Sequence, residues 1–315
     1  MSEPDTVHKI LLVGLDQAGK TSILNVLNEK YNQMDNIKPT VGIERDEIKI
    51  LGIPIRTWDL GGQEKFRKDY LKLKNVRIFD QADSIFFVID VWNATRFEEA
   101  LNYYSQIMEI YEKLGQRPKI EILLHKVDPN LRHNPNTDEI LKNLKNLFQE
   151  ESVTYEISLY ATSIFDRKSI IEAFSKNLQD LIVTLQPFKK LLESVALLQK
   201  LDAAILFDEN LMILSDYYRN KVIEEMCLDT VYNSVHYLTY TNPKLAETDK
   251  FTTNFELVLN VKNTLKKFTF MDAKYRGWNV YLLTMSDKTA EVDPDAISAK
   301  FKTVAHIFEK KEKAQ

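Results

Sequence analysis

The 315-residue sequence is poor in cysteine and has no excess of basic residues. Cys227 is the only cysteine, so no intramolecular disulfide can form, and we expect a reducing compartment. Lysine and arginine number 42 against 46 aspartate and glutamate residues, which gives a net charge of -4 and no basic surface for nucleic acid. The five histidines are scattered without metal-ligand spacing. A disulfide scaffold, a nucleic-acid-binding protein and a histidine-built metal enzyme are therefore not expected.

Long apolar runs are also missing from the sequence. None approaches the roughly 20 residues that a membrane-spanning helix needs, so we expect a soluble, cytoplasmic protein without direct membrane insertion. Ser2 occupies the position at which N-myristoylation requires glycine, and the final stretch EKKEKAQ contains no prenylation cysteine. Any recruitment to a membrane surface is expected to come through partners.

Glycine is scarce and unevenly placed. Of the eight glycines, only Gly277 lies beyond residue 186. Loops that wrap a phosphate depend on glycine, so the second half is expected to be a binding platform rather than a nucleotide site. The chain exceeds the usual size of one core, and we expect two domains, 1–186 and 187–315, separated where Pro187 interrupts a helical run.

The pattern of apolar runs differs between the two halves. Up to residue 186, strand-like runs alternate with amphipathic helices, which predicts an α/β fold with a mostly parallel sheet covered on both faces. The short turn GIP at 52–54 predicts one hairpin inside that sheet. The second half predicts a smaller α+β domain with a mostly antiparallel sheet and with helices at 188–201, from about 218 and from about 294. The strand-like runs are 8–13, 46–51, 55–59, 84–90, 120–125 and 154–159, then 203–207, 211–215, 254–261, 265–275 and 278–285.

The stretch ILLVGLDQAGKTSIL, residues 10–24, passes from an apolar strand through two glycines and a lysine into an apolar helix. It matches the phosphate-loop pattern G-x-x-x-x-G-K-[ST], although an ordinary turn with a solvated lysine remains the alternative. The glycines let backbone N–H groups face a polyphosphate, to which the helix also presents its positive end. Lys20 is expected to reach the β and γ phosphates, and Thr21 to ligate Mg2+. The loop residues expected to contact the nucleotide are Gly14, Asp16, Gln17, Ala18, Gly19, Lys20, Thr21 and Ser22.

Two further stretches contain residues that could contact Mg2+ and the γ-phosphate of a bound nucleoside triphosphate. In WDLGGQE, Asp59 is expected to hold Mg2+ through water, the Gly62 backbone N–H to face the γ-phosphate, and Gln63 to orient the attacking water. In KPTVG, Thr40 is expected to bind Mg2+ and the γ-phosphate. Release of Thr40 and Gly62 after hydrolysis predicts an order-to-disorder switch. A plain turn and an ordinary loop threonine are the alternatives.

The identity of the base is expected to be read by HKVD and ATSIF, which follow the fifth and sixth strand runs. Asp128 can accept two hydrogen bonds from guanine, while the stem of Lys126 covers the ring. Because a carboxylate left without those donors is costly, adenine should be rejected by something like ~10⁴-fold. Thr162, Ser163 and the Ile164 backbone N–H complete the base site, the last facing guanine O6.

With these elements in order, residues 7–185 resemble the Ras-like P-loop small GTPases. GLDQAGKTSIL, PTVG and WDLGGQEKFR are similar to the Arf branch, whereas SLYATSIFDRKSIIEAFSKNLQDLI is similar to the Rag/Gtr GTPases. KLLESVALLQKLDAAILFD, in the second half, is similar to the roadblock-type domain of those proteins. His125 stands where these families usually have an asparagine, which leaves that nucleotide contact unaccounted for.

The resemblance implies a GTP/GDP-binding molecular switch that uses Mg2+ and signals through nucleotide-dependent partners. Those partners are a second copy or a related GTPase, roadblock-domain scaffold proteins, and GTPase-activating and exchange proteins. Hydrolysis is expected to be slow, because DNIKPT offers no arginine ahead of Thr40 and Asp16 adds negative charge near the γ-phosphate. An Arf-like trafficking GTPase and a non-hydrolysing GTP-bound scaffold remain the alternatives. The expected pairing surfaces are the strand 254–261 and the helix residues Val222, Ile223, Met226, Val231 and Val235.

Overall fold

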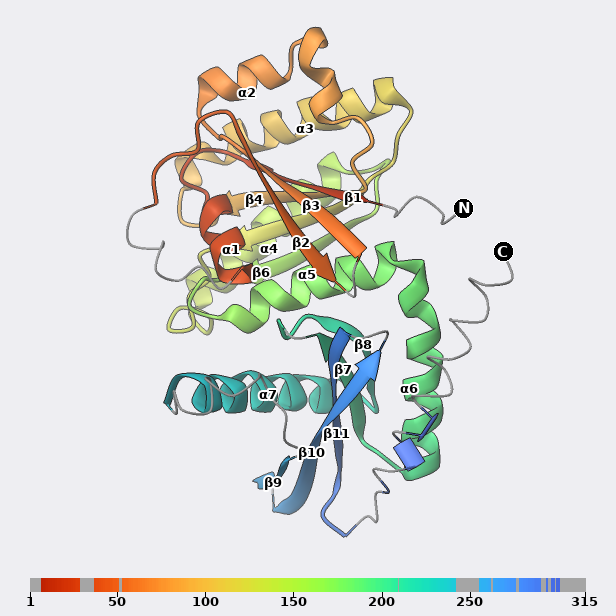
Figure 1. Cartoon of the computed structure of the whole chain (residues 1–315). Coiled ribbons are helices and arrows are strands. Elements are labelled where there is room, and N and C mark those ends of the chain that lie inside the picture. Colours follow the sequence, from red (N-terminus) through yellow and green to blue (C-terminus); the bar gives the residue numbers. More distant parts are fainter. Residues whose placement is uncertain are drawn as a thin grey trace, which may run out of the picture. The chain divides into compact units, whose positions relative to one another are not determined.

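The computed structural model divides the chain into two compact units, Met1–Ala173 and Phe174–Gln315, each built around one sheet (Figure 1). The division falls inside α5 (Arg167–Leu181), ahead of the 186/187 boundary predicted from Pro187. Pro187 lies in the first turn of α6 (Gln186–Gln199), where its fixed φ suits a helix start. The residues that the structure describes are 7–28, 37–50, 53–208, 210–241, 255–261, 263–275, 278–289, 293, 296–297 and 299–300.

The first unit contains a six-stranded sheet in the order β2-β3-β1-β4-β5-β6. Strands β1, β3, β4, β5 and β6 run parallel, and β2 pairs antiparallel with β3, so the predicted α/β class and the predicted pairing of the second and third strands are confirmed, while part of the turn predicted at 52–54 lies outside the described residues. The strands are β1 (His8–Gly14), β2 (Ile43–Ile50), β3 (Ile53–Leu60), β4 (Ser84–Asp90), β5 (Lys119–His125) and β6 (Ile157–Thr162).

Strand β6 begins three residues later than its predicted span of 154–159. The reason is a turn after α4, closed by a 2.9 Å hydrogen bond from the Tyr155 N–H to the Ser152 carbonyl. The strand then pairs with β5 from Ile157 to Thr162, which places Thr162 beside His125. The carboxyl ends of the parallel strands, and the motifs that follow them, therefore share one edge of the sheet.

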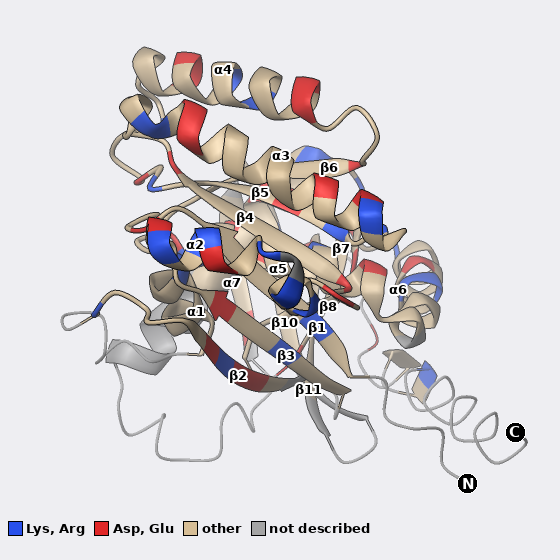
Figure 2. Cartoon of the chain, turned by 90° about the horizontal axis from the view of Figure 1, so that it is seen from above, with Lys and Arg blue, Asp and Glu red and all other residues tan. Residues whose placement is uncertain are grey.

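Helices cover both faces of this sheet, with α3 on one side and α1 on the other in Figure 1. Aromatic packing fixes α3 and α4 to the sheet, because the rings of Phe87, Tyr104 and Phe148 lie with centroids 5.2 to 5.6 Å apart. Basic and acidic residues are interspersed along α3 and α4 in Figure 2, as the balanced composition predicts. The helices are α1 (Lys20–Leu27), α2 (Glu64–Tyr70), η2 (Leu73–Ile78), η3 (Ala94–Arg96), α3 (Phe97–Leu114), α4 (Pro135–Glu151) and the first part of α5.

The second unit contains a five-stranded antiparallel sheet in the order β8-β7-β11-β10-β9, so the predicted antiparallel sheet is confirmed. The C-terminal part of α5 belongs to this unit, since the Ser175 Oγ accepts a 2.9 Å hydrogen bond from the Ile213 N–H. The elements after α5 are η4 (Val183–Leu185), α6, β7 (Ala203–Asp208), β8 (Ile213–Tyr218), α7 (Lys221–Thr241), β9 (Phe255–Val261), β10 (Thr264–Tyr275) and β11 (Trp278–Asp287). Of the helix predicted from about residue 294, only 296–297 and 299–300 lie in the described part, and they are helical.

The core of the second unit encloses Cys227, which is fully buried in α7. Its Sγ contacts the Met285 Sδ at 3.1 Å, and burial raises the pKa of the thiol to about 12. Ile223 and Met226 pack against the same core. Only Val222 of the predicted helix surface is shown to be exposed, and the side chains of Val231 and Val235 lie outside the described residues. In the described chain, no helix is both long enough and apolar enough to span a membrane.

Candidate functional site

The loop between β1 and α1 requires glycine at both ends of its turn. Gly14 has φ +145°, and a Cβ atom there would lie 2.2 Å from the Val88 carbonyl oxygen. Gly19 has φ +100°, and Gln17 between them also has a positive φ, of 62°. Larger residues would be strained at Gly14 and Gly19 by φ alone, so the sequence pattern and the backbone geometry agree.

Lys20 lies inside this loop rather than in solvent, with 6% of its surface exposed. Its Nζ donates hydrogen bonds to the carbonyl oxygens of Leu15 at 2.8 Å and Gly14 at 3.2 Å. Burial lowers the pKa of Lys20 to about 8, while Asp59 and Asp16 act to raise it. The loop thus curves around a buried amine, which is where an anionic group can be neutralised.

Three oxygen-bearing side chains meet next to Lys20. The Thr21 hydroxyl donates to the Asp59 Oδ2 at 2.5 Å, the Thr40 hydroxyl donates to the same oxygen at 3.1 Å, and the two hydroxyls lie 3.0 Å apart. The Asp59 Oδ1 is buried and has no hydrogen-bond partner, and burial raises the pKa of this carboxyl group. Hydroxyl and carboxylate oxygens are the ligands that Mg2+ prefers, so this group fits the ion predicted from the sequence.

The segment after β3 lies directly against the loop. The Gly62 carbonyl accepts a 3.0 Å hydrogen bond from the Asp16 N–H, a contact separate from the one predicted between the Gly62 N–H and the γ-phosphate. A Cβ atom on Gly62 would lie 2.3 Å from the Asp16 nitrogen, which explains the need for glycine. Gln63 is half-buried and forms the N-terminal cap position of α2. The segment with Thr40 is held here too, by a 2.8 Å bond from the Gly61 N–H to the Gly42 carbonyl.

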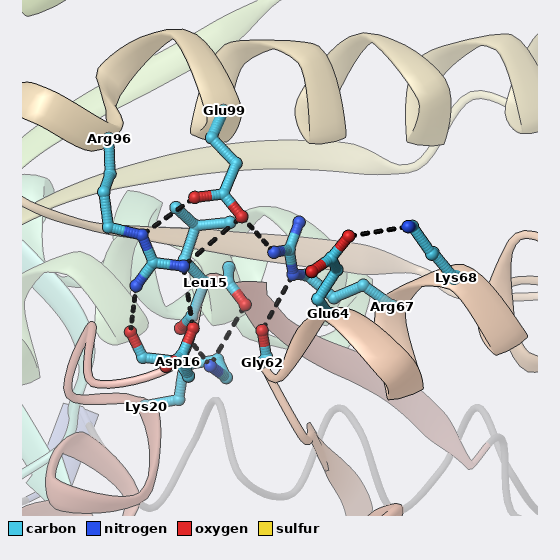
Figure 3. Close-up of polar contacts among 10 residues, drawn as sticks. Leu15, Asp16, Lys20, Gly62, Glu64, Arg67, Lys68, Arg96 and Glu99 are labelled. Atoms are coloured by element: carbon cyan, nitrogen blue, oxygen red, sulfur yellow. Dashed lines mark hydrogen bonds and ion pairs between the residues drawn. The ribbon is translucent and has the colours of Figure 1, made fainter.

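The carboxylate of Asp16, which is expected to add negative charge near the γ-phosphate, is paired with an arginine. The Arg96 Nη2 lies 2.8 Å from the Asp16 Oδ1, and the Arg96 Nε lies 2.8 Å from the Glu99 Oε2 (Figure 3). Sequence reasoning missed Arg96 and Glu99 because no local motif marks them. The Asp16–Arg96 pair joins residues 80 positions apart.

The two predicted base-reading motifs are also brought together. The Ser163 hydroxyl donates a 2.6 Å hydrogen bond to the Asp128 Oδ1 and accepts one from the Phe165 N–H. Lys126 has φ +71° and forms a 2.7 Å ion pair with Asp90. Ile164 follows Ser163 and is half-buried. The ends of β5 and β6 therefore form one polar surface around the Asp128 carboxylate.

His125 links this surface to the phosphate loop through contacts with Thr162 and Gly19. Its ring is 2% exposed, and its Nδ1 lies 2.9 Å from the Thr162 hydroxyl oxygen. The ring also packs on Gly19, where an added Cβ atom would lie 2.5 Å from the His125 Cδ2. Burial lowers the pKa of His125 to about 4, so the ring is neutral at pH 7. A neutral imidazole thus bridges the end of β6 and the phosphate loop.

Comparison with known proteins decides between the families that the sequence resembles. The Gtr1/RagA G protein conserved region matches residues 9–238. The chain belongs to the Gtr1/RagA family. It is 26% identical over 287 residues to the Ras-related GTP-binding protein A of Dictyostelium discoideum, a match that covers 90% of this chain and 91% of that protein. It is 27% identical over 272 residues to the GTP-binding protein GTR2 of Saccharomyces cerevisiae, covering 83% of this chain and 77% of that protein.

Members of the Gtr1/RagA family are GTPases, so this chain is a GTP-binding switch with a Ras-like fold that binds GTP and GDP. The strand order of the first unit, with one antiparallel strand at the edge of a parallel sheet, agrees with that fold. A solved structure of the Arl6 BBS3 small GTPase from Trypanosoma brucei is 20% identical and has a TM-score of 0.45. That match covers 56% of this chain and 98% of the other.

Proposed function

We propose that this Gtr1/RagA-type GTPase binds Mg2+ and the phosphates of GTP at the loop between β1 and α1. The observation that carries the proposal is the convergence of Thr21, Thr40 and Asp59, whose oxygens lie 2.5 to 3.1 Å apart beside the buried Lys20. Mg2+ bound here would neutralise charge that develops on the phosphates during hydrolysis. Lys20 would hold the β and γ phosphates, and the backbone of residues 14–22 would surround them.

We propose that Asp128 recognises guanine, with the Lys126 stem over the ring and the Ile164 N–H toward O6. The 2.6 Å bond from Ser163 supports this assignment, because it fixes one oxygen of Asp128 and orients the carboxylate. His125 then acts by holding Gly19 and Thr162 in place rather than by touching the base.

The same proposal assigns Gln63 to the attacking water and predicts slow hydrolysis. Residues 35–40, DNIKPT, contain no arginine, and the guanidinium of Arg96 is already paired with Asp16 and Glu99. An arginine that reaches the transition state is worth about 10³ to 10⁵ in rate, so an activating protein is expected to supply one. The presence of Gln63 favours this reading over a non-hydrolysing scaffold, and the family match favours it over an Arf-like trafficking role.

We further propose that the second unit is a roadblock-type pairing module. Val258 of β9 and Leu265 of β10 are 42% and 44% exposed, and they lie on the sheet face opposite Leu257 and Leu259, which pack on the core. This face also carries the ion pair of Lys267 with Glu256, so two exposed apolar side chains lie among polar groups beside an edge strand, where association can cover them. The partner would be a second copy or a related GTPase, and recruitment to a membrane surface from the cytoplasm would follow through such partners.

The experiment that tests the nucleotide site is a binding measurement with fluorescent GDP and GTP on the full-length protein. Lys20→Ala should abolish tight Mg2+-dependent binding of GTP, because it removes the amine from the loop. Lys142→Ala is the matched control, since Lys142 is exposed on α4. Wild-type affinity in Lys20→Ala, with Mg2+ present, would remove the loop from the proposal.

A further inference from the structure

A closed ring of hydrogen bonds and ion pairs joins the phosphate loop to the segment after β3, and Figure 3 shows the links that its side chains make. The Asp16 N–H donates to the Gly62 carbonyl, which also accepts a 2.8 Å bond from the Arg67 Nε. The Arg67 Nη2 pairs with the Glu99 Oε1, and Glu99 binds Arg96. Arg96 pairs with the Asp16 carboxylate and closes the ring. The ring therefore holds Asp16 through both its backbone and its side chain.

Arg67 is buried, so removing its hydrogen-bond partners would leave an unpaired charge in the interior. It is 7% exposed, and its guanidinium lies 5.2 Å from the centre of the Tyr103 ring. A buried cation needs hydrogen-bond partners, and Arg67 donates hydrogen bonds to the Gly62 carbonyl and to the Glu99 carboxylate. Hydrogen bonds from Arg96 and Arg67 lower the pKa of Glu99, so this carboxylate is ionised at neutral pH. Glu99 thus binds two arginines, of which Arg67 contacts the Gly62 carbonyl and Arg96 contacts the Asp16 carboxylate.

The ring also supports the segment that contains Thr40. Gly42, two residues beyond Thr40, accepts hydrogen bonds from the Gly61 N–H at 2.8 Å and from the Tyr70 hydroxyl at 2.7 Å. Gly61 and Tyr70 flank the ring members Gly62 and Arg67 along the chain. Anything that holds Gly62 against Asp16 therefore also keeps Thr40 near Thr21 and Asp59.

We propose that Arg67, Arg96 and Glu99 are positioning residues that favour GTP over GDP by holding the segment after β3 on the phosphate loop. The inference rests on the proposed nucleotide site. In the proposed site, the third phosphate of GTP would be contacted by residues 61–62 as well as by the loop, so GTP would depend on that segment. GDP lacks this phosphate and depends on the loop alone. Loss of the ring should therefore weaken GTP binding and leave GDP binding unchanged.

The test compares Glu99→Gln with Glu98→Gln in the full-length protein. Glu99→Gln keeps the size of the side chain and removes the charge that binds both arginines, whereas Glu98 is exposed on the same turn of α3. Affinities for GDP and for a non-hydrolysable GTP analogue are measured by displacement of a fluorescent nucleotide with Mg2+ present. We expect Glu99→Gln to lower the affinity for the GTP analogue about three- to tenfold and the affinity for GDP less than about twofold. Glu98→Gln should change neither of the two affinities by more than about twofold.

A second variant separates positioning from general stability. Arg96→Lys keeps the positive charge but loses the planar fork that contacts Asp16 and Glu99 together, so we expect a smaller change in the same ratio. Equal weakening of both nucleotides, together with a lower melting temperature, would show a structural role and overturn the inference. An unchanged ratio in Glu99→Gln would also overturn it, provided the wild type binds both nucleotides. If the wild type binds neither, the proposed nucleotide site itself is wrong.

Discussion

The Nδ1 atom of His125 lies 2.9 Å from the Thr162 hydroxyl oxygen, and this pair connects the ends of β5 and β6. The same imidazole fills the space next to Gly19, so one buried ring contacts both the base-side loops and the phosphate loop. Its protonation state therefore affects the whole edge of the sheet.

Acid should destabilise the protein through His125. The folded pKa of about 4 lies below the usual 6.5, so the unfolded state binds more protons and stability falls as pH drops from about 6.5 to about 4. The loss should reach about 3 kcal/mol at the low end. Urea unfolding of wild type and His125→Asn at several pH values isolates this effect. The variant should lose less stability than the wild type over that range, and parallel losses would contradict the assignment.

Asp128→Asn should change the choice of base. The variant loses an acceptor for two guanine N–H donors, so we expect at least about a 100-fold weaker affinity for GTP together with a gain for xanthine nucleotides. Competition binding with GTP, ATP and XTP measures both effects. Asp138→Asn, at an exposed position of α4, is the control and should behave as wild type. Normal GTP binding by Asp128→Asn would show that the base is read elsewhere.

Intrinsic hydrolysis should be slow, on the order of 10⁻⁴ to 10⁻² per second. Single-turnover assays with purified protein measure this rate directly. Gln63→Leu should lower it at least about tenfold while leaving GTP affinity close to wild type, because the amide acts on water rather than on the phosphates. Turnover of several GTP molecules per second by the protein alone would contradict the proposal.

Pairing through the outer sheet face of the second unit should depend on Val258. Val258→Asp places a charge on that face and should shift the full-length protein toward monomer in light scattering at tens of micromolar. Val153→Asp is the matched control, since Val153 is 86% exposed in the first unit and lies far from β9 in sequence. If the wild type alone is already monomeric under these conditions, self-pairing is wrong and only a different partner remains.

Much of the candidate site could be predicted because its members are contiguous. The glycine spacing, Lys20 and Thr21 follow one another in a pattern that only a few backbone conformations satisfy. The parallel strand runs also predict which motifs share an edge. The ion pair of Asp16 with Arg96 could not be predicted this way, because tertiary packing brings together residues that have no common local pattern. The start of β6 was misplaced for a similar reason, since strand pairing rather than residue propensity sets where it begins.

The enclosed thiol of Cys227 has a practical consequence for studying the switch. A maleimide reagent attacks thiolates that it can reach, and this thiol is buried with a pKa of about 12. The native cysteine can therefore stay in place during labelling. A single cysteine introduced at exposed Val153 or Glu98 would carry a fluorophore alone, so nucleotide-driven movement of the first unit becomes measurable by fluorescence without altering the core of the second.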